Sequence, residues 1–530
     1  MTLPRRQRHT HIGLSPNTIQ WCWPRRRRRS FSCSDVRSVD AEGRKRLPIA
    51  GRRRRSIMGL EWSDLGPTHH DTQLIDSIIR ASRNMEAKTF RVRRILRLSS
   101  WLVGVVAFWG MYSTVSQAEL PGNKPNIVIL LADDLGWNDV GYHGSSVKTP
   151  HLDRFVRDGI ELDRFYVAPY CVPTRAGLLT GRYPHRFGLR YRANFAVRAT
   201  LPPEALTLAE VLADAGYARR ACIGKWHLGD SQQQHPLKQG FRHFYGMLGG
   251  MVHYFDHRTI PFGANAENRP RLLDWHRGHD ICHDEGYSTD LIGNEAVRFI
   301  ERSSSEQPLF LYVAFNAPHL PLHAKPELLD RADVDTDRVT QLLTADETTN
   351  RAIYSAMVAS LDANVGRILA TIDQRGLRER TLVLFLSDNG GVARFGISDN
   401  SPLRGGKNMV LEGGVRVPVA IRWPAAWRGG RKVTEPLAYI DVLPTLARIA
   451  GVERLPDGLD GKDVFEVLAG EQPTLERNIY LGPQTLVGKR WKLVDDELFS
   501  IATDPGETIN VAQDHPAAVH SLKRELARLR

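Results

Sequence analysis

Three uninterrupted apolar runs constrain the fold of this chain more than any other feature of its sequence. They cover Asn126–Ala132, Leu309–Phe315 and Thr381–Leu386. Such runs are typical of strands that are buried on both faces, as in a parallel sheet. The stretches Thr207–Ala215 and Thr348–Arg375 have helical periodicity instead. The alternation of the two patterns predicts an α/β fold with a large, mostly parallel central sheet flanked by helices.

Polar residues follow each of these apolar runs. Asp133 and Asp134 come directly after the first run, Asn316 and His319 follow the second, and residues 387–391 after the third read S-D-N-G-G. In open α/β sheets, ligand sites gather beyond the carboxyl ends of the strands. We therefore expect these groups, which are distant in the sequence, to converge on one site.

The chain beyond the third run has a different pattern. A helix is expected at Asp441–Ala450, and Arg490–Leu498 reads as strands of a small antiparallel sheet. A closing helix is expected at Pro516–Arg530. We therefore divide the chain into a main domain, residues 119–425, and a remainder, residues 426–530, which holds the C-terminal part of the core and a smaller C-terminal subdomain.

The net charge of +13 is concentrated at the beginning of the chain. Residues 1–118 contain 23 Lys and Arg against 8 Asp and Glu, whereas the rest of the chain contains 49 against 51. The basicity therefore says nothing about the partners of the main domain, and no nucleic acid is expected among them. Residues 1–84, with the runs Arg25–Arg29 and Arg52–Arg55, lack apolar periodicity, which predicts a disordered basic segment upstream of the true start. A nucleic-acid-binding arm is the alternative.

An export signal is predicted at residues 85–118. Met85 opens it, arginines follow from Arg91, Leu98–Val115 is an apolar stretch, and the small residues Ser116 and Ala118 fit a cleavage site. Cleavage after Ala118 predicts a periplasmic or secreted protein without stable membrane insertion. A retained membrane anchor is the alternative, because the apolar stretch is nearly long enough to span a bilayer.

Only three cysteines lie beyond the predicted export signal, too few for a disulfide framework. Cys222 lies in an apolar run and is expected to be a small buried side chain, with a Cys222–Cys282 bridge as the minor alternative. Cys171 opens the segment C-V-P-T-R, in which Pro173 is typical of a first helical turn. A cysteine at a helix N-terminus lies beside free amide N–H groups, and as a thiol it would be a nucleophile of low pKa. Arg175, one turn further on, could hold an oxyanion there.

The C-x-P-x-R segment followed by T-G-R resembles the signature of the sulfatase family, in which the cysteine is oxidised to formylglycine. Thr174 stands where that family usually has serine. The resemblance implies an alkaline-phosphatase-like α/β sandwich, and it includes G-K-W-H-L-G, P-L-R-G-G-K and E-G-G-V-R-V-P, at residues 224–229, 402–407 and 412–418. These motifs look closest to the arylsulfatase B, or N-acetylgalactosamine-4-sulfatase, type. A formylglycine-generating enzyme is then the partner in maturation.

The resemblance also implies the site residues and the cofactor. One Ca²⁺ would be bound, with Mg²⁺ left open, by Asp133, Asp134, Cys171, Asp388 and Asn389. The catalytic residues would be Cys171, Arg175, Lys225, His227, His319 and Lys407. Positive groups of this kind suit a sulfate ester, because negative charge develops on its oxygens in the transition state. Either His319 or Lys407 would protonate the departing alcohol. Arg182 would support the nucleophile loop.

The substrate expected is an aryl sulfate or, preferably, a sulfated glycan. The segments Tyr191–Ala199 and Met251–His279, rich in cationic and aromatic residues, are predicted to line the mouth of the site. The nearest alternative function is a phosphate or phosphonate monoester hydrolase of the same superfamily, which would need further metal ligands. A catalytically inactive protein that binds sulfated glycans is the alternative from another class, and the retention of every expected catalytic residue argues against it.

Overall fold

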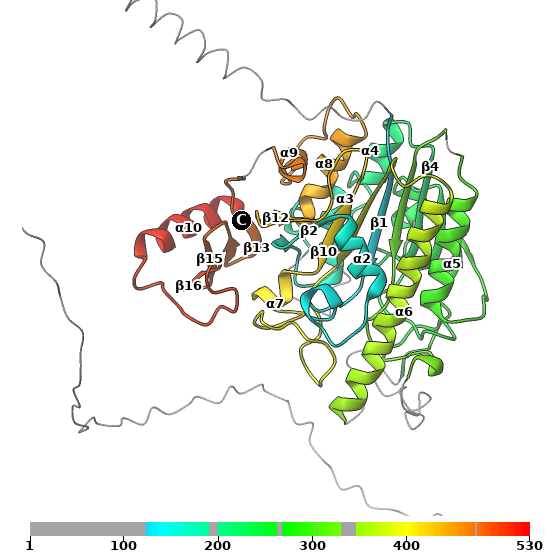
Figure 1. The fold of residues 1–530 in the computed structure, drawn as a ribbon, viewed down its shortest axis with the longest axis horizontal. Coiled ribbons are helices and arrows are strands. Elements are labelled where there is room, and N and C mark those ends of the chain that lie inside the picture. The colour runs from blue at the N-terminus through cyan, green and yellow to red at the C-terminus, as the bar shows by residue number, and fades with distance from the viewer. Residues whose placement is uncertain (1–122, 190–199, 262–267, 305, 330–345, 472–473) are drawn as a thin grey trace, which may run out of the picture. The chain divides into compact units, whose positions relative to one another are not determined.

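The computed structural model describes residues 123–189, 200–261, 268–304, 306–329, 346–471 and 474–530 (Figure 1). The predicted basic segment, the export signal and the mouth segment 191–199 lie outside these residues. Among the described residues, no helix is both long and apolar enough to cross a membrane.

A ten-stranded sheet forms the centre of the described chain, in the order β11-β2-β10-β9-β1-β8-β4-β5-β6-β7. Its middle strands β9, β1, β8, β4 and β5 run parallel, while β10, β6 and β7 make the antiparallel pairings. The strands of this sheet are β1 (Asn126–Ala132), β2 (Ile160–Leu162), β4 (Arg219–Lys225), β5 (His243–Met247), β6 (His276–Arg277), β7 (Asp280–Ile281), β8 (Leu309–Ala314), β9 (Thr381–Ser387), β10 (Val419–Arg422) and β11 (Arg431–Val433).

The three predicted strands are the three central ones, and all their residues are buried. Alternate side chains of β1 enter two separate cores: Ile127 and Ile129 pack on one face, Val128 and Leu130 on the other. This is why these strands are apolar throughout instead of alternating. The prediction of a mostly parallel α/β sheet is confirmed.

Helices cover both faces of the sheet (Figure 1). The core on one face includes residues of α3, α4 and α8, and the core on the other includes residues of α2, α5 and α6. The helices are α2 (Pro150–Asp158), α3 (Cys171–Thr180), α4 (Leu208–Asp214), α5 (Ser288–Glu301), α6 (Glu347–Gln374), α7 (Glu412–Val415), α8 (Val442–Ile449), α9 (Phe465–Ala469) and α10 (Pro516–Leu529). The predicted helices 207–215, 348–375 and 441–450 correspond to α4, α6 and α8 within two residues.

Local capping explains where two of these helices begin. Thr207 caps α4 in a capping box, in which its side chain accepts from the Glu210 amide and the Glu210 carboxylate accepts from the Thr207 amide. Asp346 caps α6 by accepting from the amides of Thr348 and Thr349.

A separate four-stranded antiparallel sheet and helix α10 form the C-terminal part, as predicted. Its strands are β13 (Ile479–Gly482), β14 (Thr485–Val487), β15 (Trp491–Val494) and β16 (Glu497–Ser500), and a further two-stranded sheet joins β3 (Phe165–Tyr166) to β12 (Leu437–Ala438). Arg164 links the C-terminal sheet to the main body by donating to the carbonyls of Gly488 and Lys489, at 2.6 and 2.7 Å.

Candidate active site

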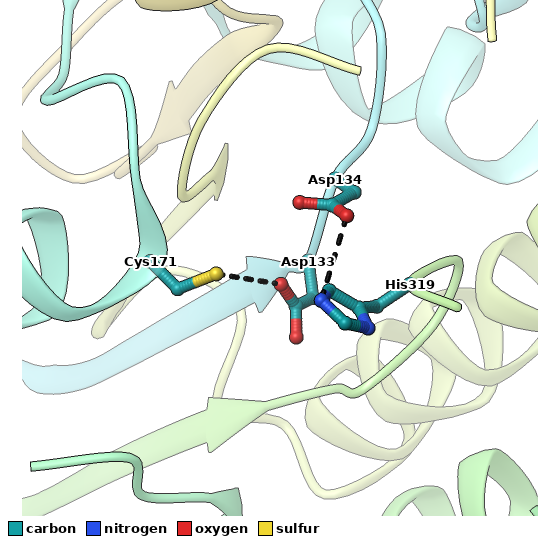
Figure 2. A group of neighbouring side chains, drawn as sticks. All are labelled: Asp133, Asp134, Cys171 and His319. Carbon is teal, nitrogen blue, oxygen red and sulfur yellow. Dashed lines mark hydrogen bonds and ion pairs between the residues drawn. The ribbon is translucent and has the colours of Figure 1, made fainter. Parts of the chain in front are cut away.

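The carboxyl ends of the central strands bring the predicted polar residues together. Asp133 and Asp134 follow β1, and Asp388 and Asn389 follow its neighbour β9, whose last residue is paired with the last residue of β1. His319 follows β8 on the other side of β1. Figure 2 shows Asp133, Asp134, His319 and Cys171 facing one another. Each of these four offers a ligand atom, and the four atoms lie within 4.8 Å of one another.

Cys171 is the first residue of α3, as the proline pattern predicted. Its Sγ lies 3.5 Å from Asp133 Oδ1, and the side chain is buried. The prediction of a low thiol pKa is wrong. Burial raises the pKa of Cys171 to about 12, despite the nearby charges of Lys225 and Lys407. The unmodified thiol would therefore be a poor nucleophile at neutral pH, because the thiolate is the reactive form.

Arg175 uses its guanidinium to hold other site residues, so in the described structure it does not offer a free oxyanion contact. Nε and Nη2 both donate to Asp388 Oδ2, at 3.0 and 2.8 Å, and Nη1 donates to the carbonyl of Lys225 at 2.8 Å. Burial would lower the pKa of Arg175, but the neighbouring acidic groups, Asp388 foremost, together outweigh it and raise that pKa. Arg175 therefore stays charged and ties α3 to the ends of β4 and β9.

Lys225, the last residue of β4, forms a fully buried ion pair with Asp133. Burial would raise the pKa of Asp133, but the neighbouring positive groups, Lys225 foremost, together outweigh it and hold that pKa well below its usual range. Burial and the neighbouring charge of Asp133 raise the pKa of Asp388 to about 7. The charges of Lys225, Asp133 and Asp388 therefore influence one another.

Lys407 and His319 both face the carboxylate of Asp134. Lys407 Nζ lies 2.7 Å from this carboxylate, and His319 Nε2 lies 3.6 Å from its Oδ2. Burial would lower the pKa of Lys407, but the neighbouring acidic groups, Asp134 foremost, together outweigh it and raise that pKa. Burial and the charge of Lys407 lower the pKa of His319 to about 4. A charged lysine and a neutral histidine therefore lie beside the same carboxylate.

His227 is enclosed next to this group. The backbone of Gly250 packs so closely on the imidazole that a Cβ there would lie 2.4 Å from Nε2. Burial and the charge of Lys225 lower the pKa of His227 well below its usual value. Its Nδ1 is buried without a hydrogen-bond partner among the described residues. A neutral imidazole with a spare nitrogen can accept a proton.

A divalent cation fits the donor atoms at this edge of the sheet. Asn389 Nδ2 donates to Asp134 Oδ1 at 2.7 Å, whereas Asn389 Oδ1 is buried with no partner in the described chain. Carboxylate and amide oxygens are the donors that calcium prefers. The compact group of Asp133, Asp134, Cys171 and His319 overlaps the expected ligand set in its first three members.

The acidic and basic groups at this edge of the sheet are equal in number before any ion or substrate binds. We define the strand-end cluster as six buried or nearly buried groups, three acidic and three basic: Asp133, Asp134, Asp388, Arg175, Lys225 and Lys407. A divalent cation added to this cluster would leave an excess of positive charge. Such an excess would favour an anionic substrate beside Cys171.

The structure adds a supporting network that the sequence reasoning missed. The hydroxyl of Tyr354 lies 3.1 Å from the carbonyl of Asp134 and 2.8 Å from Asp139 Oδ2, and Arg351 donates to Asp139 Oδ1 at 2.6 Å. Tyr354 and Arg351 belong to α6, whose apolar periodicity gave no sign of this role. Asp134 itself has a positive φ of 67°, a strained conformation for a residue with a side chain.

The other two cysteines of the described chain follow the simpler prediction. Cys222 is buried in β4, and both Cys222 and Cys282 are free, so the alternative of a bridge between them is wrong.

Comparison with known proteins places this arrangement in a family. The sulfatase family profile matches residues 125–452. Mouse N-acetylgalactosamine-6-sulfatase is 34% identical over 432 residues, which cover 75% of this chain and 78% of the relative. A solved structure described as Ps i-CgsB in complex with k-i-k-neocarrahexaose is 31% identical, with a TM-score of 0.66 over 77% of this chain and 92% of that chain. The phosphonate monoester hydrolase of Agrobacterium radiobacter shares the fold, with a TM-score of 0.53 at 21% identity over 77% of this chain and 95% of that chain.

The chain therefore belongs to the sulfatase family, and its fold and family support hydrolysis of sulfate esters. The relative reported above is a 6-sulfatase, so it does not support the 4-sulfatase type that the motifs suggested.

Proposed function

We propose that the protein removes sulfate from a sulfated carbohydrate, with formylglycine at position 171 and one Ca²⁺ at the strand ends. The observation that carries this proposal is the position of Cys171, buried at a helix N-terminus within the strand-end cluster. A thiol with a pKa of about 12 is a poor nucleophile at neutral pH, because little of it is thiolate. Formylglycine at the same position would not depend on a thiolate. Calcium is proposed over magnesium because the donors are oxygens on several separate loops.

The residues of the chain divide the chemistry among them. When present, formylglycine hydrate supplies a nucleophilic oxygen and Ca²⁺ supplies Lewis acidity. Lys225 and Lys407 bind the sulfate oxygens, and Arg175 holds Asp388 against the site. His227 would accept a proton through Nδ1, which has no hydrogen-bond partner among the described residues. His319 Nε2 and Lys407 Nζ flank the same carboxylate, so either is placed to protonate the departing alcohol oxygen.

The carbohydrate substrate is proposed from two sources. The related 6-sulfatase is named for an amino sugar, and the solved relative is in complex with k-i-k-neocarrahexaose. In this chain, the described part of the predicted mouth carries exposed cationic and aromatic groups such as Arg258, Arg271 and Phe255. Cations suit an acidic polysaccharide and aromatic faces suit sugar rings. Export through the segment 85–118 and maturation by a formylglycine-generating enzyme belong to the same proposal.

The decisive experiment measures mass and activity on one sample. The chain is co-expressed with a formylglycine-generating enzyme, and the peptide containing Cys171 is weighed. We expect it to be about 18 Da lighter than the cysteine form. The same sample, with Ca²⁺, should hydrolyse an aryl sulfate and sulfated oligosaccharides. A fully modified protein that cleaves phosphate or phosphonate esters but no sulfate ester would refute the proposal and favour the alternative hydrolase.

A further inference from the structure

We infer that Lys492, in the C-terminal sheet, is a positioning residue for the loop that carries Lys407 and for the adjoining Asn389. This inference rests on the proposed function of those two residues. The C-terminal sheet would then help to hold active-site residues in place.

Lys492 is completely buried in β15, although its side chain carries a charge. Its Nζ lies 3.0 Å from Glu412 Oε1 and 2.9 Å from Glu507 Oε1. Both glutamates are also buried. We call Lys492, Glu412 and Glu507 the Lys492 cluster. A buried lysine between two carboxylates fixes both of them, since a buried charge without its partner is strongly unfavourable.

Glu507 ties down both ends of the segment 404–412. Its Oε2 accepts a hydrogen bond from the amide of Glu412 at 2.7 Å. Its backbone carbonyl accepts from Arg404 Nη1 at 3.0 Å. The loop is closed on itself as well, because the amide of Gly413 donates to the carbonyl of Arg404 at 2.8 Å. Lys407 is therefore carried on a loop whose two ends are held by the Lys492 cluster.

The same loop contacts the strand-end cluster through its backbone. Gly390, next to Asn389, donates its amide to the carbonyl of Gly414, and Lys407 donates its amide to the carbonyl of Gly391, each at 3.0 Å. The approach is so close that a Cβ on Gly390 would lie 1.9 Å from the carbonyl oxygen of Gly413. A shift of Glu412 would therefore reach both Asn389 and Lys407.

The experiment compares two lysines of one hairpin. Lys492→Met keeps the aliphatic stem and removes the buried charge. Lys489→Met is the matched control, because Lys489 forms a half-exposed ion pair with Glu435 and does not contact the loop. Misplacing a reacting group by about 1 Å can lower the rate by about 10²-fold. We expect kcat for an aryl sulfate to fall by roughly this factor in Lys492→Met and by less than about twofold in Lys489→Met.

Hydrogen exchange separates positioning from a general loss of stability. In Lys492→Met, deuterium uptake in peptides covering 404–414 should rise while uptake in the β1 peptide, residues 126–132, stays unchanged. Lys492→Arg should restore part of the protection. Unchanged exchange over 404–414, or an equal rise in both peptides, would overturn the inference.

Two further measurements keep the test decisive. If Lys492→Met does not fold, Glu507→Gln provides the same comparison, because it weakens the cluster without leaving two carboxylates unpaired. If the wild-type protein hydrolyses no sulfate ester, the proposed function fails, but the exchange result still decides whether Lys492 positions the loop.

Discussion

The two buried charge clusters of this protein contain similar residues but differ in how completely their atoms are paired. In the Lys492 cluster one lysine lies between two glutamates, and Tyr166 and Arg416 also contact Glu412. In the strand-end cluster, Asn389 Oδ1 and the nearby His227 Nδ1 have no partner among the described residues. Burial and charge are therefore common to both clusters, and incomplete pairing distinguishes the one that we propose binds an ion and an anion.

The greatest loss of activity should come from replacing Cys171, which lies beside the strand-end cluster. Cys171→Ala should lower sulfate-ester hydrolysis by at least about 10⁴-fold, because it removes the residue that we propose becomes the nucleophile. The matched control is Cys222→Ala, which removes a buried thiol in β4 that makes no contact with the reacting atoms. Turnover of an aryl sulfate by both purified variants tests this. Equal losses in the two variants would contradict the role of Cys171.

The second prediction tests whether the unpaired oxygen of Asn389 binds a metal ion. Asn389→Ala should raise the Ca²⁺ concentration needed for half-maximal thermal stabilisation by about 10- to 100-fold. Asn126→Ala is the control, because Asn126 is a buried asparagine at the opposite end of β1, bonded to Thr381 and Leu309. Thermal unfolding across a Ca²⁺ titration measures the effect. A control variant that shifts as much as Asn389→Ala would show that the effect is not local.

The third prediction concerns the Lys492 cluster. Tyr166→Phe removes the hydroxyl that donates to Glu412 Oε2 at 3.1 Å. The free energy of unfolding should fall by about 1.5–3 kcal/mol, the usual range for a hydrogen bond to a charged group. Thermal stabilisation by Ca²⁺ should remain as in the wild type, since Tyr166 does not contact the metal donors. Urea unfolding with and without Ca²⁺ measures both quantities. A loss of the Ca²⁺ response would contradict the prediction, because it would link the Lys492 cluster to ion binding.

The smallest loss of stability is expected where the charged partners of a carboxylate are partly exposed to solvent. Glu295 in α5 pairs with His243, Arg277 and Arg298. Burial would raise its pKa, but the hydrogen bonds from His243 and Arg298 and the charge of Arg277 together outweigh it and lower that pKa to about 2. A lowered carboxyl pKa stabilises the fold above the unfolded value of about 4.5, and this stabilisation is lost as pH falls towards 2.

Glu295→Gln should therefore destabilise the protein by about 1 kcal/mol at pH 7, because its arginine partners are nearly half exposed and solvent screens them. The difference from the wild type should shrink as the pH is lowered from 4.5 towards 2. Urea unfolding at a series of pH values measures it. A difference that is constant over this range would assign the effect to packing instead of charge.

The order of residues along the chain was enough to predict the class of the fold, the family and the meeting of polar residues at one sheet edge. Continuous apolar runs can be buried only between two layers, so β1, β8 and β9 were predictable within one residue. Residues that follow such strands must meet at one sheet edge. For this reason Asp133, Asp134 and His319 could be grouped from their positions in the sequence.

The electrostatics and the supporting contacts depend instead on how distant segments pack. The pKa of Cys171 was predicted to be low from its place at a helix N-terminus, but burial outweighs that local effect. Tyr354 and Lys492 looked like ordinary helix and strand residues, and only packing between distant segments gives them their partners. Desolvation depends on every atom around a group, whereas a sequence pattern describes only its neighbours along the chain.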